Sequence, residues 1–271
     1  MIKIFDKYVR DVFYKYTTIL ASVLTFILTF IDIKNTVKIY LLILFAVICV
    51  IMYICIYFHL KKKSNVVLTI NNTTVIVKYG DLFEETCGKV IGVNEYFDTL
   101  VDEDIVSSNS LHGQVIKKYY NDIKALDKKI ENDDNLKNNI YEINDKRKNI
   151  KNIKYNLGTI FKDKDFYFLA LTKFSDDNKA YLYLNDYTLC LLKMWNELNR
   201  SYNREPIALP ILGSGITRIK DKISITEQEL LEIMIWTLKI SQVKFSYPSE
   251  IHIIIRNDLK NKINLNKLKN I

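Results

Sequence analysis

The sequence predicts an α/β domain with helices on both sides of its sheet, preceded by a helical hairpin in a membrane. Two observations predict the domain. Short apolar strands alternate with helical patterns after Lys63, and the late strand at residues 250–256 (EIHIIIR) is almost continuously apolar, as in a sheet covered on both faces. The third observation predicts the hairpin: the long uncharged runs gather between residues 16 and 60.

Two apolar runs predict membrane spans at about 16–33 and 39–60, within a membrane-anchoring segment at 1–63. The second run is uncharged apart from His59 and is long enough to cross a hydrocarbon core of about 30 Å. The first is shorter and meets Asp32 near its end, where a carboxylate can reach the headgroups. A signal peptide is the alternative, but no small-residue cleavage site follows and a second span begins within a few residues.

Basic residues set the expected orientation of the hairpin. They precede the first span and follow the second, and most of the net charge of +8 belongs to these flanks. The positive-inside rule therefore predicts a multi-pass protein of the cell inner membrane with both termini in the cytoplasm. Because little of the excess charge falls on residues 64–271, we expect no nucleic-acid partner.

Four hydroxyl side chains lie on one face of the first span. Thr18, Ser22, Thr25 and Thr29 follow one another at spacings of four, three and four. They form a helix–helix seam, or a face that lines water when several copies assemble, or simply a lipid-compatible surface whose hydroxyls bond to the preceding turn. The sequence leaves these alternatives open.

The first half of the soluble part contains strands, a turn and helices. Asn71 and Asn72 join two β-branched runs in a hairpin pattern. The charged, Asn-rich segment 131–154 is expected to hold a second exposed helix with flanking loops. The expected elements are strands at 66–70, 74–77, 89–93, 157–161 and 166–171, a turn at 80–83, and a helical pattern over 111–130.

The second half continues the alternation. Thr226 and Glu229 have the spacing of a capping box and predict a helix start. The remaining expected elements are a helix at 185–199, strands at 207–210 and 250–256, and an amphipathic helix from 258.

A glycine-containing loop follows the strand at 207–210. Glycine permits positive φ and lets backbone N–H groups approach an anion, and the loop lies where a strand end meets a helix start. A tight turn without a ligand is the alternative. The candidate anion-binding residues are Leu212, Gly213, Ser214, Gly215, Ile216 and Thr217, with Arg218 as a possible phosphate partner or a solvent-facing side chain.

A second candidate surface follows the strand at 89–93. Asn94 and Asp98 are suited to sugar hydroxyls, and Phe97 can stack on a base or ribose. The alternative is that Phe97 covers the sheet edge and Asp98 caps a turn. His112 and Gly113 could border the same cleft, although a lone histidine before a helix is more often a surface or capping residue.

The cysteines and histidines predict no metal site. Cys49, Cys55, Cys87 and Cys190 show no metal-ligand spacing and no disulfide framework, and the three histidines are scattered along the chain. A reducing, intracellular location fits.

Three segments resemble macrodomains, the ADP-ribose-binding α/β modules. They are VKYGDL at 77–82, VIGVN at 90–94 and PILGSGI at 210–216. The resemblance implies a macrodomain-like mixed sheet flanked by helices over 64–271. It also implies that Asp81 and the Leu82 backbone bind adenine, that the 213–217 amides bind diphosphate, and that Asn94 with Phe97 or Asp98 binds a ribose.

The sequence departs from this family at two loops. SSNSLHG at 107–113 replaces the glycine run of the first phosphate loop, and NEYFD at 94–98 replaces the family's Asn-Ala-Ala-Asn. De-ADP-ribosylating macrodomains position the attacking water with the first loop, so we expect no catalytic residues. A membrane-tethered ADP-ribosyl hydrolase and a protein-binding membrane anchor remain the alternatives.

The combination of two spans with a macrodomain is similar to the ThsA effectors of type II Thoeris antiphage systems. VNEYFDT, SLHG, LGTI and FYFLALT carry this resemblance. It implies no cofactor but a ligand, histidine-ADP-ribose or a related ADP-ribose derivative, made by a TIR-domain partner. It further implies a homo-oligomer on activation that disrupts the lipid bilayer and kills the infected cell.

Overall fold

The chain forms two compact units. A computed structural model describes residues 4–31, 34–148, 150–215, 218–220, 225–246 and 248–270. One unit comprises Met1–Val66 together with Asn264–Asn270, and the other comprises Val67–Ile263.

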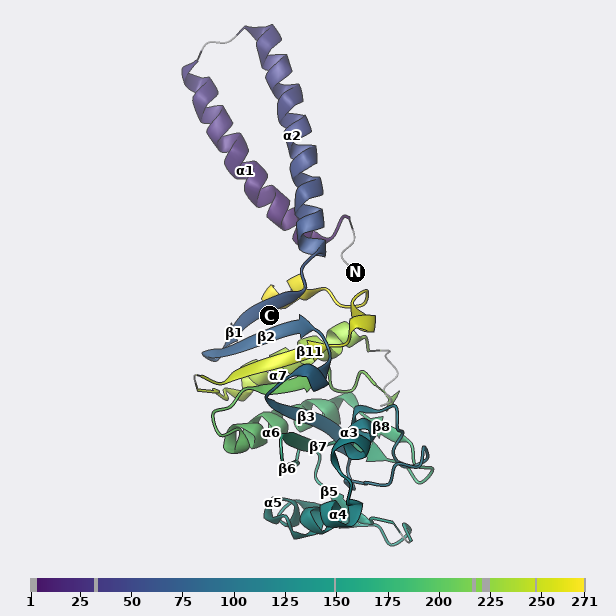
Figure 1. The fold of residues 1–271 in the computed structure, drawn as a ribbon. Helices are drawn as coiled ribbons and strands as arrows, with labels where there is room; N and C mark the ends of the chain where they lie inside the picture. Colours follow the sequence, from purple (N-terminus) through teal and green to yellow (C-terminus); the bar gives the residue numbers. More distant parts are fainter. Residues whose placement is uncertain are drawn as a thin grey trace. The chain divides into compact units, whose positions relative to one another are not determined.

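The first unit contains two long apolar helices, α1 (Lys7–Phe30) and α2 (Asn35–Lys61) (Figure 1). Asp6 caps α1 by accepting a hydrogen bond from the Tyr8 backbone N–H at 2.9 Å. The rings of Phe13 and Tyr53 meet edge to face at 5.1 Å between the two helices. Both helices are long and apolar enough to cross a membrane.

The second unit is built on a mixed sheet, as predicted. Among the described residues, nine strands follow the order β1-β2-β11-β9-β3-β7-β8-β10, with β6 paired to β7. The neighbours from β2 to β7 are parallel, whereas β6 and β8 run antiparallel to β7. The strands are β1 (Asn65–Ile70), β2 (Thr73–Tyr79), β3 (Gly88–Asn94), β6 (Ile160–Asp163), β7 (Phe166–Phe174), β8 (Ala180–Leu182), β9 (Ile207–Pro210), β10 (Arg218–Ile219) and β11 (Glu250–Ile255).

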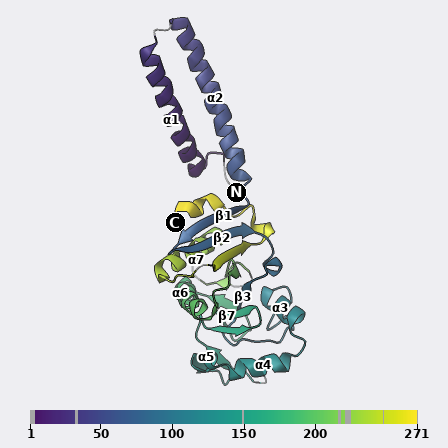
Figure 2. The same ribbon diagram turned by 60° about the vertical axis from the view of Figure 1, so that its left-hand side comes forward.

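Helices cover both faces of this sheet. Figure 2 shows α3 (Leu111–Tyr119) and α6 (Leu184–Ser201) on opposite sides of β3 and β7. On the α6 side, α7 (Glu227–Ser241) packs against α6, and the Trp195 indole N–H donates to Thr237 Oγ1 at 3.1 Å. The predicted capping box of Thr226 and Glu229 starts α7.

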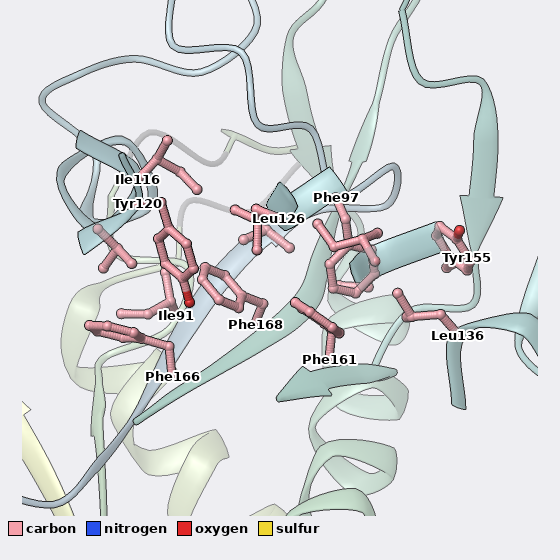
Figure 3. Packing of buried hydrophobic residues seen from close by; sticks show 14 of the residues in the cluster. Ile91, Phe97, Ile116, Tyr120, Leu126, Leu136, Tyr155, Phe161, Phe166 and Phe168 are labelled. Carbon is pink, nitrogen blue, oxygen red and sulfur yellow. The ribbon is translucent and has the colours of Figure 1, made fainter. Parts of the chain in front are cut away.

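The core on the α3 side is largely aromatic. The rings of Phe166 and Phe168 in β7 meet the Tyr120 ring, and Phe161 of β6 stacks on Phe168 (Figure 3). Leu126 belongs to α4 (Ile123–Asn132), which buries its apolar face against this cluster. These contacts hold β7, one of the strands that carry the candidate site.

Several predicted elements differ in the structure. The helical pattern over 111–130 is divided into α3 and α4, because the Asp122 side chain caps a new helix by accepting from the Ala125 N–H at 3.0 Å. The strand predicted at 157–161 is β6, three residues later. The turn at 80–83 contains the 3₁₀ turn η1 (Leu82–Glu84).

Two predicted helices are wrong. Segment 131–154 contains a single helical turn, α5 (Asp134–Lys137), and then a two-stranded antiparallel ribbon of β4 (Ile140–Ile143) and β5 (Ile153–Tyr155). The end of the chain forms the 3₁₀ turns η2 (Asn257–Leu259) and η3 (Leu265–Asn270) instead of an α-helix from 258. In both places side chains bond to residues far away in the sequence, Arg147 to Asp98 and Asn266 to the Leu60 carbonyl, and such contacts can override a local helical pattern.

Candidate functional site

A cavity of about 490 Å³ opens at the carboxyl edge of the sheet. The parallel strands β3, β7, β9 and β11 all end there, which is the usual position of ligand crevices in such sheets. Among the described residues, the cavity is lined by 92–94, 103–107, 109–112, 114, 171, 172, 174, 177–180, 210–215, 254, 256 and 259.

The predicted anion-binding loop forms one wall of this cavity. Leu212, Gly213, Ser214 and Gly215 all line it. Gly213 has φ +80°, a left-handed conformation that favours glycine. A Cβ added at Gly215 would meet no atom within 4 Å, so this position is open. Ile216 and Thr217 lie outside the described residues, and of Arg218 the structure describes only the backbone, in β10.

The helices below the loop hold it in place. The buried Tyr187 hydroxyl on α6 donates to the Leu212 carbonyl at 2.9 Å. The Leu212 N–H faces Met234 Sδ on α7 at 3.4 Å. The Ser214 hydroxyl donates to the Ile211 carbonyl at 2.7 Å and closes the turn. These bonds hold residues 211–214 in place before any ligand arrives, which lowers the entropy cost of binding.

The start of α3 forms another wall. The Ser110 hydroxyl accepts from the Gly113 N–H at 3.0 Å and donates to the Ser107 carbonyl at 2.7 Å. A Cβ at Gly113 would lie 2.2 Å from the Ser107 oxygen, so glycine lets the helix pack onto the preceding loop. Gly113 itself does not line the cavity. The helix directs its positive dipole end toward the cavity, which favours an anion.

His112 lines the cavity as a neutral imidazole. Its side chain is buried next to the Phe168 ring, with ring centroids 6.4 Å apart. Burial, together with the positive charge of Lys151, lowers the pKa of His112 to about 3. At neutral pH it can take part in hydrogen bonds but supplies no proton.

The NEYFD segment is divided between the cavity and the protein interior. Asn94 lines the cavity, and its Nδ2 donates to Asp98 Oδ2 at 2.8 Å. Asp98 is buried and pairs with Arg147 Nη2 at 3.0 Å. Burial raises the pKa of Asp98, while Arg147 opposes the shift. Phe97 is buried against Tyr155, with ring centroids at 5.4 Å.

The structure therefore brings Asn94 and His112 together with the glycine loop, whereas Phe97 and Asp98 are outside the described cavity lining. Asp81 and Leu82 are also outside it. Asp81 is exposed and caps η1 by accepting from the Phe83 N–H at 2.9 Å, and Leu82 is buried. Their roles in adenine or ribose binding stay predictions.

Sequence reasoning missed several cavity residues. Arg256 follows β11 directly and lines the cavity, with its Nη2 bonded to Asp258 Oδ2 at 2.9 Å. A basic residue immediately after the apolar strand EIHIII is the signal that could have identified it. Asn178 and Lys179 in the turn between β7 and β8 also line the cavity, and their sequence carries no comparable signal.

The hydroxyl face of α1 borders a shallow groove. Thr18, Ser22 and Thr25 line it together with Tyr14, Thr17 and Ala21. Thr29 does not line it, and its hydroxyl donates to the Thr25 carbonyl one turn earlier at 2.9 Å. The lipid-compatible alternative therefore describes Thr29, while the other three share a surface that a second helix could occupy.

Comparisons with known proteins place these features in context. The family model described as "Thoeris protein ThsA, Macro domain" matches residues 75–256. A Thoeris protein ThsA of Bacillus amyloliquefaciens (strain Y2) is 41% identical over 257 residues, covering 93% of this chain and 85% of that protein.

Among solved structures, the Oceanobacillus iheyensis macrodomain with MES bound has a TM-score of 0.47 at 11% identity, covering 76% of this chain and 95% of that one. The same macrodomain with ADP has a TM-score of 0.45 at 11% identity, covering 76% and 93%. Both TM-scores are low, so the family model and the relative that is 41% identical decide which family the chain belongs to.

Proposed function

Because the chain belongs to the Thoeris ThsA macro-domain family, we propose that it is an antiphage defence effector that senses an ADP-ribose-derived signal. The observation that carries this proposal is the cavity of about 490 Å³ between the glycine loop and the start of α3. Its volume is that of a small-molecule site. A glycine loop after a strand and the start of a helix are both backbone segments that suit a diphosphate.

The diphosphate binds along the loop in this proposal. The N–H groups of Gly213 and Gly215 are the donors that this loop offers, because those of Leu212 and Ser214 already face Met234 Sδ and the Ile211 carbonyl. Ile216 and Thr217 follow in the sequence. Arg256 supplies a positive charge at the carboxyl end of β11. Asn94 offers its side-chain amide to a ribose, and Asp98 acts through Asn94 by fixing the orientation of that amide.

The chemistry of the lining supports binding without catalysis. Its acidic side chains are already engaged by neighbouring groups: Glu103 with Ser107 and Ser108, Asp104 with Asn178, and Asp177 with Ser175 and Lys179. The pKa of His112 is about 3, so its neutral imidazole is a weak base. A general base works best when its pKa lies near the operating pH, so we propose a sensor that leaves its ligand intact.

The signal in this proposal is histidine-ADP-ribose made by a TIR-domain partner. Ligand binding favours a homo-oligomer of the hairpin in the inner membrane, with both termini cytoplasmic, and the assembled helices disrupt the bilayer and kill the cell. Chain continuity supports the coupling. Leu259 lines the cavity, and a few residues later Asn264 Nδ2 donates to Asp6 Oδ2, which caps α1, at 3.3 Å.

Replacing Gly215 tests the ligand site. Gly215→Leu places a side chain in the open space beside the loop, so we expect at least about tenfold weaker binding, equivalent to about 1.4 kcal/mol. The measurement is calorimetric titration of the full-length protein in detergent with ADP-ribose and with histidine-ADP-ribose. Asn196→Leu, at an exposed position of α6 outside the cavity, is the matched control.

The same samples distinguish a sensor from a hydrolase. Chromatography after the titration should recover histidine-ADP-ribose intact, and release of free ADP-ribose would support the hydrolase instead. Unchanged affinity in Gly215→Leu would remove the loop from the binding site, and no binding by the unmodified protein would contradict the sensor altogether.

A further inference from the structure

A cluster of side chains outside the cavity joins three segments that are far apart in the sequence. Glu85 and Cys87 precede β3, and His252 lies within β11. One carboxylate oxygen, the sulfur and one ring nitrogen of these residues all lie within 4.8 Å of one another, and the three side chains are half-buried. His252 Nδ1 is 2.9 Å from Glu85 Oε2, and His252 Nε2 is 3.1 Å from Glu250 Oε2.

We propose that this cluster binds one zinc ion through Cys87, His252 and Glu85. A thiolate, an imidazole and a carboxylate form a donor set that zinc accepts, with the fourth position left for water. Zinc bonds of about 2.0–2.3 Å put neighbouring ligand atoms roughly 3.3–3.7 Å apart in a tetrahedral site. The three ligand atoms already lie within 4.8 Å of one another, so the approach that zinc requires is small.

Zinc would replace protons that hold the cluster together. Both nitrogens of His252 face carboxylate oxygens, so in the absence of a metal each nitrogen carries a proton. On metal binding one nitrogen loses its proton and becomes a ligand, and the Cys87 thiol loses its proton as well. The other nitrogen keeps its hydrogen bond to a carboxylate, an arrangement that orients a histidine ligand.

The surrounding charges favour a divalent cation. A Cys87 thiolate with the carboxylates of Glu85 and Glu250 carries three negative charges. A zinc ion and the Lys78 ammonium, which is 2.8 Å from Glu85 Oε1, balance them. The Lys89 ammonium donates a hydrogen bond to the Cys87 carbonyl at 2.8 Å.

The position of the cluster gives zinc a structural role. The cluster joins β11 to the segment before β3, across the intervening strand β9. The carboxyl ends of β3 and β11 line the ligand cavity, with Asn94 on one and Arg256 just after the other. Zinc therefore fixes the spacing of two strands that carry cavity residues, without contacting the ligand.

Cobalt reports directly on thiolate ligation. Full-length protein in detergent, stripped with a chelator and kept reduced, is titrated with Co²⁺ while the absorption spectrum is recorded. We expect one Co²⁺ per chain, tetrahedral d–d bands and a thiolate-to-cobalt charge-transfer band, all lost when Zn²⁺ is added. Zn²⁺ should also raise the melting temperature of the stripped protein.

Variants identify the ligands. Cys87→Ser should abolish the charge-transfer band, and His252→Gln should weaken Zn²⁺ binding by about 100-fold or more. Cys55→Ser, in α2, is the matched thiol control and should leave the spectrum unchanged. Circular dichroism checks that each variant is folded.

Two results would overturn the proposal: wild-type protein without a stoichiometric charge-transfer band, or a folded Cys87→Ser variant that retains it. If Cys87→Ser does not fold, the Cys49→Ser/Cys55→Ser double variant, which lacks both thiols of α2, is compared with the wild-type protein instead. A band that survives in the double variant supports the site, and a band that disappears assigns the metal to the hairpin and contradicts it.

Discussion

His112 illustrates, at the scale of one residue, how burial makes stability depend on pH. Its pKa is about 3 in the folded protein, below the value of about 6.5 expected in the unfolded chain. As the pH falls below about 6.5, the unfolded chain binds a proton that the folded protein does not. The contribution of neutral His112 to the free energy of unfolding is therefore fully present above pH ~6.5 and is lost progressively as the pH falls toward ~3.

We predict that His112→Gln flattens this dependence. Between pH 6 and pH 4 the wild-type free energy of unfolding should fall more steeply than that of the variant, by up to about 1.4 kcal/mol per pH unit. Melting temperatures of the full-length proteins across this range are the measurement. Asp98, whose raised pKa acts in the opposite direction, is present in both proteins and cancels in the comparison. Parallel profiles would show that His112 is accessible to protons.

At the scale of elements, the segment between β4 and β5 is tied to the loop after β3 through Arg147. Its guanidinium pairs with buried Asp98 and lies 3.8 Å from the centre of the Tyr96 ring. We predict that Arg147→Leu lowers the free energy of unfolding by about 3–5 kcal/mol, because Asp98 would remain buried without its charge partner. Denaturant unfolding monitored by tryptophan fluorescence is the measurement.

The double variant Asp98→Asn/Arg147→Leu separates charge from packing. Removing both charges should recover part of the loss, since no unpaired carboxylate then remains. If the double variant is no more stable than Arg147→Leu alone, the guanidinium contributes through its contact with Tyr96 and the charge pair does not explain the effect.

Elements with local signals could be predicted from the sequence. The Thr226–Glu229 capping box, the Asn71-Asn72 turn and the apolar strand β11 all depend on neighbouring residues, and all are present. A helix was predicted wrongly where distant residues hold the segment, as in the β4–β5 ribbon, whose connecting residue Arg147 pairs with Asp98. The same limit applied to sites. The glycine loop is contiguous and could be predicted, whereas Glu85 and His252 are 167 residues apart and meet only in the fold.

For the whole molecule, the proposed function requires that ligand binding in one unit alters association of the other. The segment Asn264–Asn270 belongs to the hairpin unit although it follows the last strand of the sheet. Asn266 Nδ2 donates to the Leu60 carbonyl near the end of α2 at 3.4 Å. A ligand can shift assembly only by binding the assembled state more tightly, and this segment is the covalent path along which such a preference can act.

The groove on α1 provides the test at this scale. Ser22→Leu fills the groove that small residues keep open, and we predict that it prevents ligand-dependent assembly while leaving ligand affinity unchanged. Cross-linking of the full-length protein in liposomes, with and without histidine-ADP-ribose, is the measurement. Val23→Leu, an exposed position of α1 outside the groove, is the matched control. Because α1 is apolar with either leucine, a defect confined to Ser22→Leu would identify the hydroxyl face as a packing surface. Equal assembly of both variants would show instead that the hydroxyls are merely tolerated by lipid.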